Sequence, residues 1–184
     1  MGFKNIRENT LKPFVVKTNP NRITAISLVT GITAGFFFAY NYFLSAIILL
    51  ILSGLMDLLD GEIAKKLGKE TKRGDIADHV ADRIVDMSIF IGLAFSSAVR
   101  TEIGLITAIA VLMISYLGTQ SQAVLGERLY KGVLGRFPRT VAVLVLTALS
   151  IFNYRFIYYG MNFILGLAVL TILERLWEIH KKIQ

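Results

Sequence analysis

Residues 53–86 read SGLMDLLDGEIAKKLGKETKRGDIADHVADRIVD, and this stretch decides the fold. It places four aspartates beside or within segments that otherwise have the composition of membrane-spanning helices: Asp57, Asp60, Asp78 and Asp82. An ionised carboxylate at the centre of a bilayer costs about 2.5–3.5 kcal/mol on insertion scales, so such residues need a functional reason. The stretch therefore predicts a polar site at the edge of a helical membrane domain.

The spacing of the aspartates predicts two acidic helix faces, because side chains three or four residues apart lie on one face of a helix. The short basic connection at residues 65–73 lets the two helices run antiparallel, with their acidic faces toward each other. Carboxylates that are crowded in this way repel unless a cation lies between them, and hard oxygen ligands suit Mg²⁺, Mn²⁺ or Ca²⁺. We therefore predict a divalent-metal site. The faces consist of Asp57, Asp60, Gly61 and Ala64 on the first helix and of Gly74, Asp78 and Asp82 on the second.

Written as a pattern, Asp57-x2-Asp60-Gly61-x2-Ala64-Lys65-x8-Gly74-x3-Asp78-x3-Asp82 resembles the signature of the CDP-alcohol phosphotransferases, integral membrane enzymes of phospholipid synthesis. Seven of the eight defining positions match in type and spacing. The exception is Lys65, where the family usually carries Arg, so a phosphate would meet a point charge instead of a bidentate guanidinium. The resemblance extends to Pro20-Asn21-x2-Thr24 at the entry to the first apolar segment.

The resemblance implies that a CDP-linked lipid, CDP-diacylglycerol or CDP-archaeol, reacts with the hydroxyl of a small polar acceptor and releases CMP. It implies a divalent cofactor, Mg²⁺ or Mn²⁺, as a pair of ions about 3.5–4 Å apart. It also implies a homodimer. By resemblance the metal ligands are Asp57, Asp60, Asp78 and Asp82, the general base is Asp82, and the CDP-binding residues are Gly61, Ala64, Lys65 and Gly74.

The acceptor is predicted from the basic residues near the end of the chain. Arg136 and Arg139 bracket the start of the fifth apolar segment, and Arg175 stands where the sixth leaves the membrane, so their guanidiniums can converge on a phosphate. By resemblance they receive the phosphate of an acceptor such as inositol phosphate. The stretch Gln120-Ser121-Gln122 is similar to the archaetidylinositol-phosphate synthase branch of the family. Glycerol phosphate and serine are the alternative acceptors.

The composition is that of a membrane protein: 54% of the 184 residues are hydrophobic and only 18% are charged. The absence of cysteine excludes a disulfide scaffold and any thiolate metal site. The net charge of +7 comes from short basic blocks between apolar segments, with no aromatic residues interleaved as in a nucleic-acid platform. We therefore expect membrane lipids and phosphorylated substrates as partners, and no nucleic acid.

The hydropathy pattern predicts one all-α membrane domain over residues 1–184. Residues 1–20 mix apolar and basic side chains and are expected to form an amphipathic helix on the membrane surface. Residues 21–184 are expected to form a six-helix transmembrane bundle, in which the Gly31-x3-Gly35 motif permits close helix packing. The fifth span is short and follows Pro138, which can begin or kink a helix. The predicted apolar segments lie at about 23–40, 43–56, 76–99, 103–125, 141–152 and 156–173.

The distribution of basic residues predicts the orientation. Most of the 20 Lys and Arg residues fall in the N-terminal region, the second and fourth connections and the C-terminal tail, whereas the opposite loops carry only Arg100 and Arg155. Because positive residues favour the cytoplasmic side, we expect a multi-pass protein of the cell membrane with both termini and the aspartates facing the cytoplasm.

Two other functions fit the sequence less well than an enzyme does. A cation transporter could use an Asp-lined pathway, but transporter sites lie near the bilayer midplane and often in repeated halves, and this chain shows no repeat. A non-catalytic membrane subunit could share the fold, but the complete set of four aspartates argues against lost activity.

Overall fold

The computed structural model describes residues 20–66, 68 and 71–183, and within these ranges it contains six α-helices and no strand. The predicted all-α class is thus confirmed for the described part of the chain. The surface helix expected at residues 1–20 lies outside the described residues, apart from Pro20. The helices are α2 (Pro20–Ala39), α3 (Phe43–Lys66), α4 (Lys72–Phe95), α5 (Thr101–Leu125), α6 (Arg136–Ser150) and α7 (Arg155–Ile183).

Four of these helices, α2, α3, α5 and α7, are long and apolar enough to cross a membrane. Helix α4 has the length, with 24 residues, but charged side chains occupy much of its N-terminal half. Helix α6 has 15 residues and spans about 22 Å at 1.5 Å per residue, less than the roughly 30 Å of a hydrocarbon core. The described structure is therefore a helical membrane protein with four clear spans, fewer than the six predicted.

The ends of α4, α6 and α7 differ from the ends of the predicted apolar segments, and each difference involves polar or charged residues or a proline. Helix α4 starts earlier than predicted because Thr71 caps its first turn by accepting a 3.0 Å hydrogen bond from the Gly74 N–H. It also ends earlier, with Ser96 at its C-cap. Pro138 lies in the first turn of α6, where a missing N–H costs no helical bond, so it begins the helix and does not kink it. Helix α7 continues past residue 173, since falling hydropathy ends a membrane span without ending a helix.

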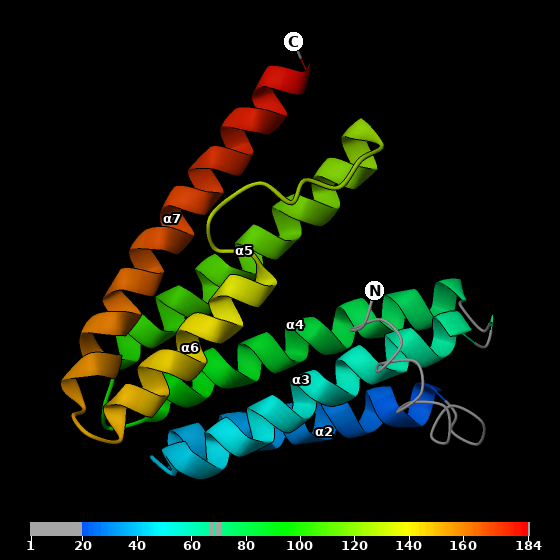
Figure 1. The fold of residues 1–184 in the computed structure, drawn as a ribbon. Helices are drawn as coiled ribbons and strands as arrows, with labels where there is room; N and C mark the ends of the chain where they lie inside the picture. Colours follow the sequence, from blue (N-terminus) through cyan, green and yellow to red (C-terminus); the bar gives the residue numbers. More distant parts are fainter. Residues whose placement is uncertain (1–19, 67, 69–70, 184) are drawn as a thin grey trace, which may run out of the picture.

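The helices form two groups that meet at one end of the molecule and diverge toward the other (Figure 1). Helices α2, α3 and α4 form one group and α5, α6 and α7 the second. At the converging end lie the α2–α3, α4–α5 and α6–α7 connections, with Arg100 and Arg155. At the diverging end lie the C-terminus of α3 and the N-terminus of α4, whereas α6 begins between the two groups (Figure 1).

Small and polar residues hold the first group together. A methyl group on Gly35 of α2 would overlap the backbone of Ser88, and one on Gly92 of α4 would overlap the Gly35 carbonyl, so only glycine allows this approach. The close packing that Gly31-x3-Gly35 predicts is therefore made within the chain, against α4. Ser27 and Ser53 join α2 to α3, each hydroxyl donating to the other residue's carbonyl, at 2.9 and 2.8 Å.

The connection between α5 and α6, residues 126–135, folds back against the second helix group (Figure 1). The N–H of Leu129 donates to Ser121 Oγ at 2.9 Å, and the N–H of Leu134 donates to Thr171 Oγ1 at 3.1 Å. Arg175 Nε donates to the carbonyl of Lys131 at 2.9 Å. Leu129 and Leu134 are buried, so the connection is a fixed wall of the bundle.

Candidate active site

The structure brings the aspartates of α3 and α4 together. Asp57, Asp60 and Asp78 each offer a carboxylate oxygen, and these oxygens lie within 4.8 Å of one another. Asp78, His79 and Asp82 form a second such group one turn along α4. The two acidic faces that the sequence predicts therefore meet at the diverging end of the molecule.

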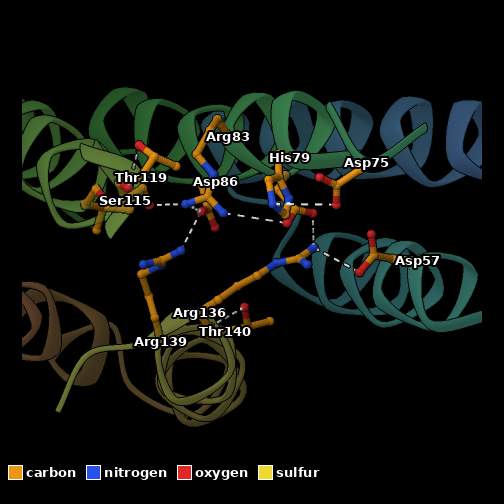
Figure 2. Close-up of polar contacts among 12 residues, drawn as sticks. Asp57, Asp75, His79, Arg83, Asp86, Ser115, Thr119, Arg136, Arg139 and Thr140 are labelled. Atoms are coloured by element: carbon orange, nitrogen blue, oxygen red, sulfur yellow. Dashed lines mark hydrogen bonds and ion pairs between the residues drawn. The ribbon is translucent and has the colours of Figure 1, made fainter. Parts of the chain in front are cut away.

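The aspartates are held by neighbouring side chains from other helices. Thr24 Oγ1 of α2 donates a hydrogen bond to Asp60 Oδ2, which is buried. Arg136 reaches from α6 and pairs with Asp57 at 3.0 Å and with Asp82. Figure 2 shows its guanidinium between the two helices that carry these acids. Arg136 thus links both helix groups through the acidic site.

Helices α3 and α4 contact each other far less, over the described residues, than each contacts α2. Helix α2 packs against both of them and joins the two acid-bearing helices. The acids nevertheless face each other, since Asp57, Asp60 and Asp78 converge across the space between α3 and α4.

The oxygen donors suit a divalent cation. Mg²⁺ binds oxygens at about 2.0–2.1 Å in an octahedron, so its ligand oxygens lie at most about 4.2 Å apart. The oxygens of Asp57, Asp60 and Asp78 lie within 4.8 Å of one another, which is close to that spacing. All three donors are carboxylates, which are ligands that Mg²⁺ and Mn²⁺ prefer. The site therefore fits a divalent metal.

A cavity of about 260 Å³ adjoins the aspartates. Asp78 and Asp82 form part of its wall, and the three arginines predicted from the sequence, Arg136, Arg139 and Arg175, all line it. Guanidiniums from two helices and carboxylates from a third thus share one enclosed space. Its other lining residues are His79, Arg83, Ile114, Ser115, Arg128, Leu129, Tyr130 and Gly135.

Two of the predicted arginines are already engaged by protein groups. Arg139 is 2% exposed and its Nη2 pairs with Asp86. Its Nε is buried without a hydrogen-bond partner. Arg175 donates from Nη1 to the Ile114 carbonyl at 2.5 Å and from Nε to the Lys131 carbonyl. Arg139 and Arg175 therefore also brace the bundle, whereas Arg136 pairs with the acids of the site.

The residues predicted to bind CDP lie where α3 ends and α4 begins. Gly61 follows Asp60 directly, and a methyl group there would meet no atom within 4 Å, so open space lies beside it. Ala64 and Lys65 stand one turn further on, with Lys65 exposed. Gly74 lies in the first turn of α4, one turn before Asp78. All four belong to the acid-bearing helices.

A sequence model of the family described as CDP-alcohol phosphatidyltransferase matches residues 17–173 of the chain. The match includes the whole aspartate pattern and both helix groups. The chain belongs to the CDP-alcohol phosphatidyltransferase family. The resemblance seen in residues 57–82 is thereby confirmed, and the protein is an enzyme of this class.

Similar proteins agree with the family in sequence and fold. Archaetidylinositol phosphate synthase of Pyrococcus horikoshii is 29% identical over 166 residues, which cover 90% of this chain and 85% of the relative. The crystal structure of Mycobacterium tuberculosis phosphatidylinositol phosphate synthase with CDP-DAG bound has the same fold, with a TM-score of 0.81 at 24% identity over 93% of this chain and 90% of the other. The same synthase in complex with manganese and citrate superposes with a TM-score of 0.80 at 24% identity, covering 95% and 87%.

The structure of this phosphatidyltransferase adds side chains that the sequence analysis did not assign. Arg83 contacts both Asp82, at 3.6 Å, and Asp86, at 3.9 Å, and donates to Ser115 of α5. The four-residue spacing from Asp78 to Asp82 continues to Asp86, so this spacing could have indicated from the sequence that Asp86 belongs to the same helix face. Figure 2 shows Arg83 and Asp86 facing Arg139 of α6.

Arg128 and His79 also line the cavity. Arg128 Nη1 lies 2.8 Å from His79 Nε2, and His79 lies 3.9 Å from Asp75. Arg128 stands in the α5–α6 connection, whose path no sequence periodicity predicts.

Proposed function

We propose that this enzyme transfers the phosphatidyl-type group of CDP-diacylglycerol or CDP-archaeol to a hydroxyl of inositol phosphate and releases CMP. The proposal rests on one observation: the candidate metal site and the arginine-lined cavity have two residues in common. Asp78 and Asp82 belong both to the carboxylate groups that suit a metal and to the lining of the arginine-rich cavity. An anionic acceptor bound by the arginines would therefore lie directly against the metal-binding acids. The relatives named archaetidylinositol phosphate and phosphatidylinositol phosphate synthases support this choice of acceptor.

The donor half of the site is assigned to α3 and α4. Asp57, Asp60, Asp78 and Asp82 hold two divalent ions, Mg²⁺ or Mn²⁺, in this proposal. When bound, the ions supply positive charge against the pyrophosphate oxygens of the CDP-lipid. The open space beside Gly61 admits the cytidine part, lined further by Ala64, Lys65 and Gly74. The manganese complex of the similar synthase supports the assignment of the metal.

The charge of the cavity favours a phosphorylated acceptor. Five arginines and two aspartates line it, which leaves a surplus of positive charge for an anion. A phosphate monoester carries about −1.5 to −2 charge at pH 7 and offers three acceptor oxygens, which guanidiniums bind well. Serine lacks this group and would leave the surplus positive charge of the cavity without an added anion. We assign Arg136, Arg139 and Arg175 to the acceptor phosphate, with Arg136 the most exposed of the three.

We assign Asp82 as the general base that accepts the proton of the acceptor hydroxyl. Its side chain is 6% exposed, and Arg136 and Arg83 hold it at the wall between the two sites. In the reaction the acceptor oxygen forms a bond to the lipid-bearing phosphorus while that phosphorus loses its bond to the oxygen of CMP. The hydroxyl proton passes to an Asp82 carboxylate oxygen. Positioned proton transfer of this kind contributes about 10²–10⁴ in rate.

We further propose that the whole chain is one membrane domain, in which α4 and α6 complete six spans with the four clear ones. The charged half of α4 then lies at the membrane surface with the aspartates. The basic residues at this end favour a cytoplasmic active site and cytoplasmic termini. Residues 1–20 lie on the membrane surface, and the enzyme is a homodimer in this proposal.

The test is CMP release by the purified enzyme in detergent with Mg²⁺ or Mn²⁺. CDP-diacylglycerol and CDP-archaeol are supplied as donors, and inositol phosphate, glycerol phosphate, serine and free inositol as acceptors. We expect release with inositol phosphate that falls at least 100-fold in Asp82→Asn. The matched control is Asp75→Asn on the same helix, whose carboxylate is 73% exposed and which should stay within about twofold of the wild type. Release with glycerol phosphate alone, or release that Asp82→Asn leaves unchanged, would refute the proposal.

A further inference from the structure

A second cavity, of about 560 Å³, lies at the converging end of the molecule, away from the aspartates. It is formed where α6 ends and α7 begins. We call its apolar lining residues, Leu146, Phe156, Gly160 and Phe163, the floor. We call its polar lining residues, Asn153, Arg155 and Tyr159, the mouth. We refer to it as the α6–α7 groove.

The floor of the groove has the shape and exposure of a site for a hydrocarbon chain. Phe156, Gly160 and Phe163 follow one another at helical spacing along one face of α7. A methyl group on Gly160 would overlap the side chain of Leu146, so the two helices approach closely and close the floor. Phe156 is 46% and Phe163 is 65% exposed, and both lie in a candidate membrane span. A lipid chain is the apolar partner that a bilayer supplies at this depth.

The mouth of the groove carries an arginine without an acidic partner. Among the described residues, no carboxylate lies within ion-pair distance of Arg155, whereas Arg100 at the same end pairs with Glu102 at 3.6 Å. Asn153 Oδ1 accepts a hydrogen bond from the backbone N–H of Arg155 at 3.0 Å, which fixes the start of α7. Arg155 thus brings an uncompensated positive charge to the rim of an apolar groove.

Aromatic side chains place this rim at the level of lipid headgroups. Tyr154, Tyr158 and Tyr159 surround Arg155 in the sequence, and the rings of Tyr158 and Tyr159 lie 5.2 Å apart. Tyrosines are enriched at the membrane–water interface, where the ring is apolar and the hydroxyl reaches water. A phosphate bound to Arg155 would therefore lie at the depth of a lipid phosphate.

We propose that the α6–α7 groove binds an anionic phospholipid of the leaflet opposite the aspartates. One chain lies along Leu146, Phe156 and Phe163, and the phosphate pairs with Arg155. The unpaired charge favours a lipid with net negative charge over a zwitterionic one, whose own cation would compete for the phosphate. The site takes no part in the transfer reaction, and its occupant does not depend on the acceptor proposed above.

Native mass spectrometry of the detergent-purified protein tests the proposal. Phosphatidylglycerol and phosphatidylcholine with identical oleoyl chains serve as probes. We expect the wild type to retain phosphatidylglycerol in preference, and Arg155→Gln to reduce the retained fraction at least fivefold. Arg155→Lys keeps the charge and should restore most of the binding. Arg100→Gln, at the paired arginine, is the matched control and should retain the wild-type fraction.

Three outcomes would overturn the proposal. One is equal retention of the two lipids by the wild type. A second is equal loss in the Arg155→Gln and Arg100→Gln variants, which would point to a general surface charge. The third is dissociation of a dimer in Arg155→Gln, which would show that a second copy of the chain covers the groove. Circular dichroism of each variant confirms that the helices are intact.

Discussion

Replacing Arg139 by methionine should destabilise the protein, because the substitution leaves Asp86 charged in the interior. Arg139 is 2% exposed and the Asp86 side chain is 8% exposed, so water screens this ion pair poorly. Removing one member of such a pair costs about 3–5 kcal/mol. Arg83 remains 3.9 Å from Asp86 and offsets part of the loss. We therefore expect about 3 kcal/mol in Arg139→Met, or about 140-fold in the unfolding equilibrium constant.

The double variant Arg139→Met with Asp86→Leu removes both charges. It therefore distinguishes the cost of leaving Asp86 unpaired from the net contribution of the ion pair to stability. Arg139 Nε has no partner, so the wild-type pair already carries an uncompensated desolvation cost. Apolar residues of similar volume should thus restore stability to within about 1 kcal/mol of the wild type. Arg83 keeps its contacts with Asp82 and Ser115 in the double variant.

Equilibrium unfolding in mixed micelles with increasing sodium dodecyl sulfate measures these differences. Far-UV circular dichroism follows the helices, and fluorescence follows Trp177, the single tryptophan. Arg100→Met is the control, since Arg100 is 62% exposed, and should change stability by less than about 0.5 kcal/mol. A cost below about 1 kcal/mol for Arg139→Met would refute the reasoning, as would single-variant costs that add up in the double variant. If the double variant folds but has a raised KM for the acceptor, Arg139 both braces the bundle and binds the acceptor.

Two further variants test the acidic site and the helix packing. Thr24→Val removes the hydroxyl that donates to Asp60, and because such supporting contacts are worth about 10–100-fold in metal affinity, Mn²⁺ binding measured by titration calorimetry should weaken by about that factor. An unchanged Kd would show that Thr24 does not support a metal ligand. Gly35→Ala forces a methyl group into the backbone of Ser88 and should destabilise the protein by about 1–3 kcal/mol in the same unfolding assay. Gly54→Ala, where no atom lies within 4 Å of the added methyl, should be neutral or stabilising, and equal effects of the two glycine variants would contradict this account.

The sequence predicted the grouping of the aspartates better than the side chains that hold them. Helix periodicity put the acids of each helix on one face, and the short connection between the helices turned the two faces toward each other, so the convergence of Asp57, Asp60 and Asp78 could be inferred from the sequence. Their supports, Thr24 and Arg136, come from other helices and depend on how α2 and α6 pack against the pair. Long-range packing of this kind leaves no local pattern.

Helices that consist of long, uninterrupted apolar segments were predicted well. Helices or helix ends that contain many charged residues were predicted less well. Hydropathy located α2, α3, α5 and α7, which are uninterrupted apolar helices. It misplaced the ends of α4 because a charged half-helix outside the hydrocarbon has no apolar signal. It also missed the last turns of α7, where the helix continues with a polar composition. The path of residues 126–135, and with it Arg128, depends on contacts with Ser121 and Thr171 that a sequence cannot show.

The two diverging helix groups place the carboxylates of the candidate site and most of its guanidiniums in different parts of the chain. The carboxylates belong to residues 20–95, whereas most of the guanidiniums that line the adjoining cavity belong to residues 126–175. Under the proposed function, substitutions in the later part change which acceptor is bound while the residues proposed to bind the donor stay intact. A chimaera that exchanges the two parts of the chain would be joined in the α4–α5 turn at residues 96–100, which separates the carboxylates from most of these guanidiniums.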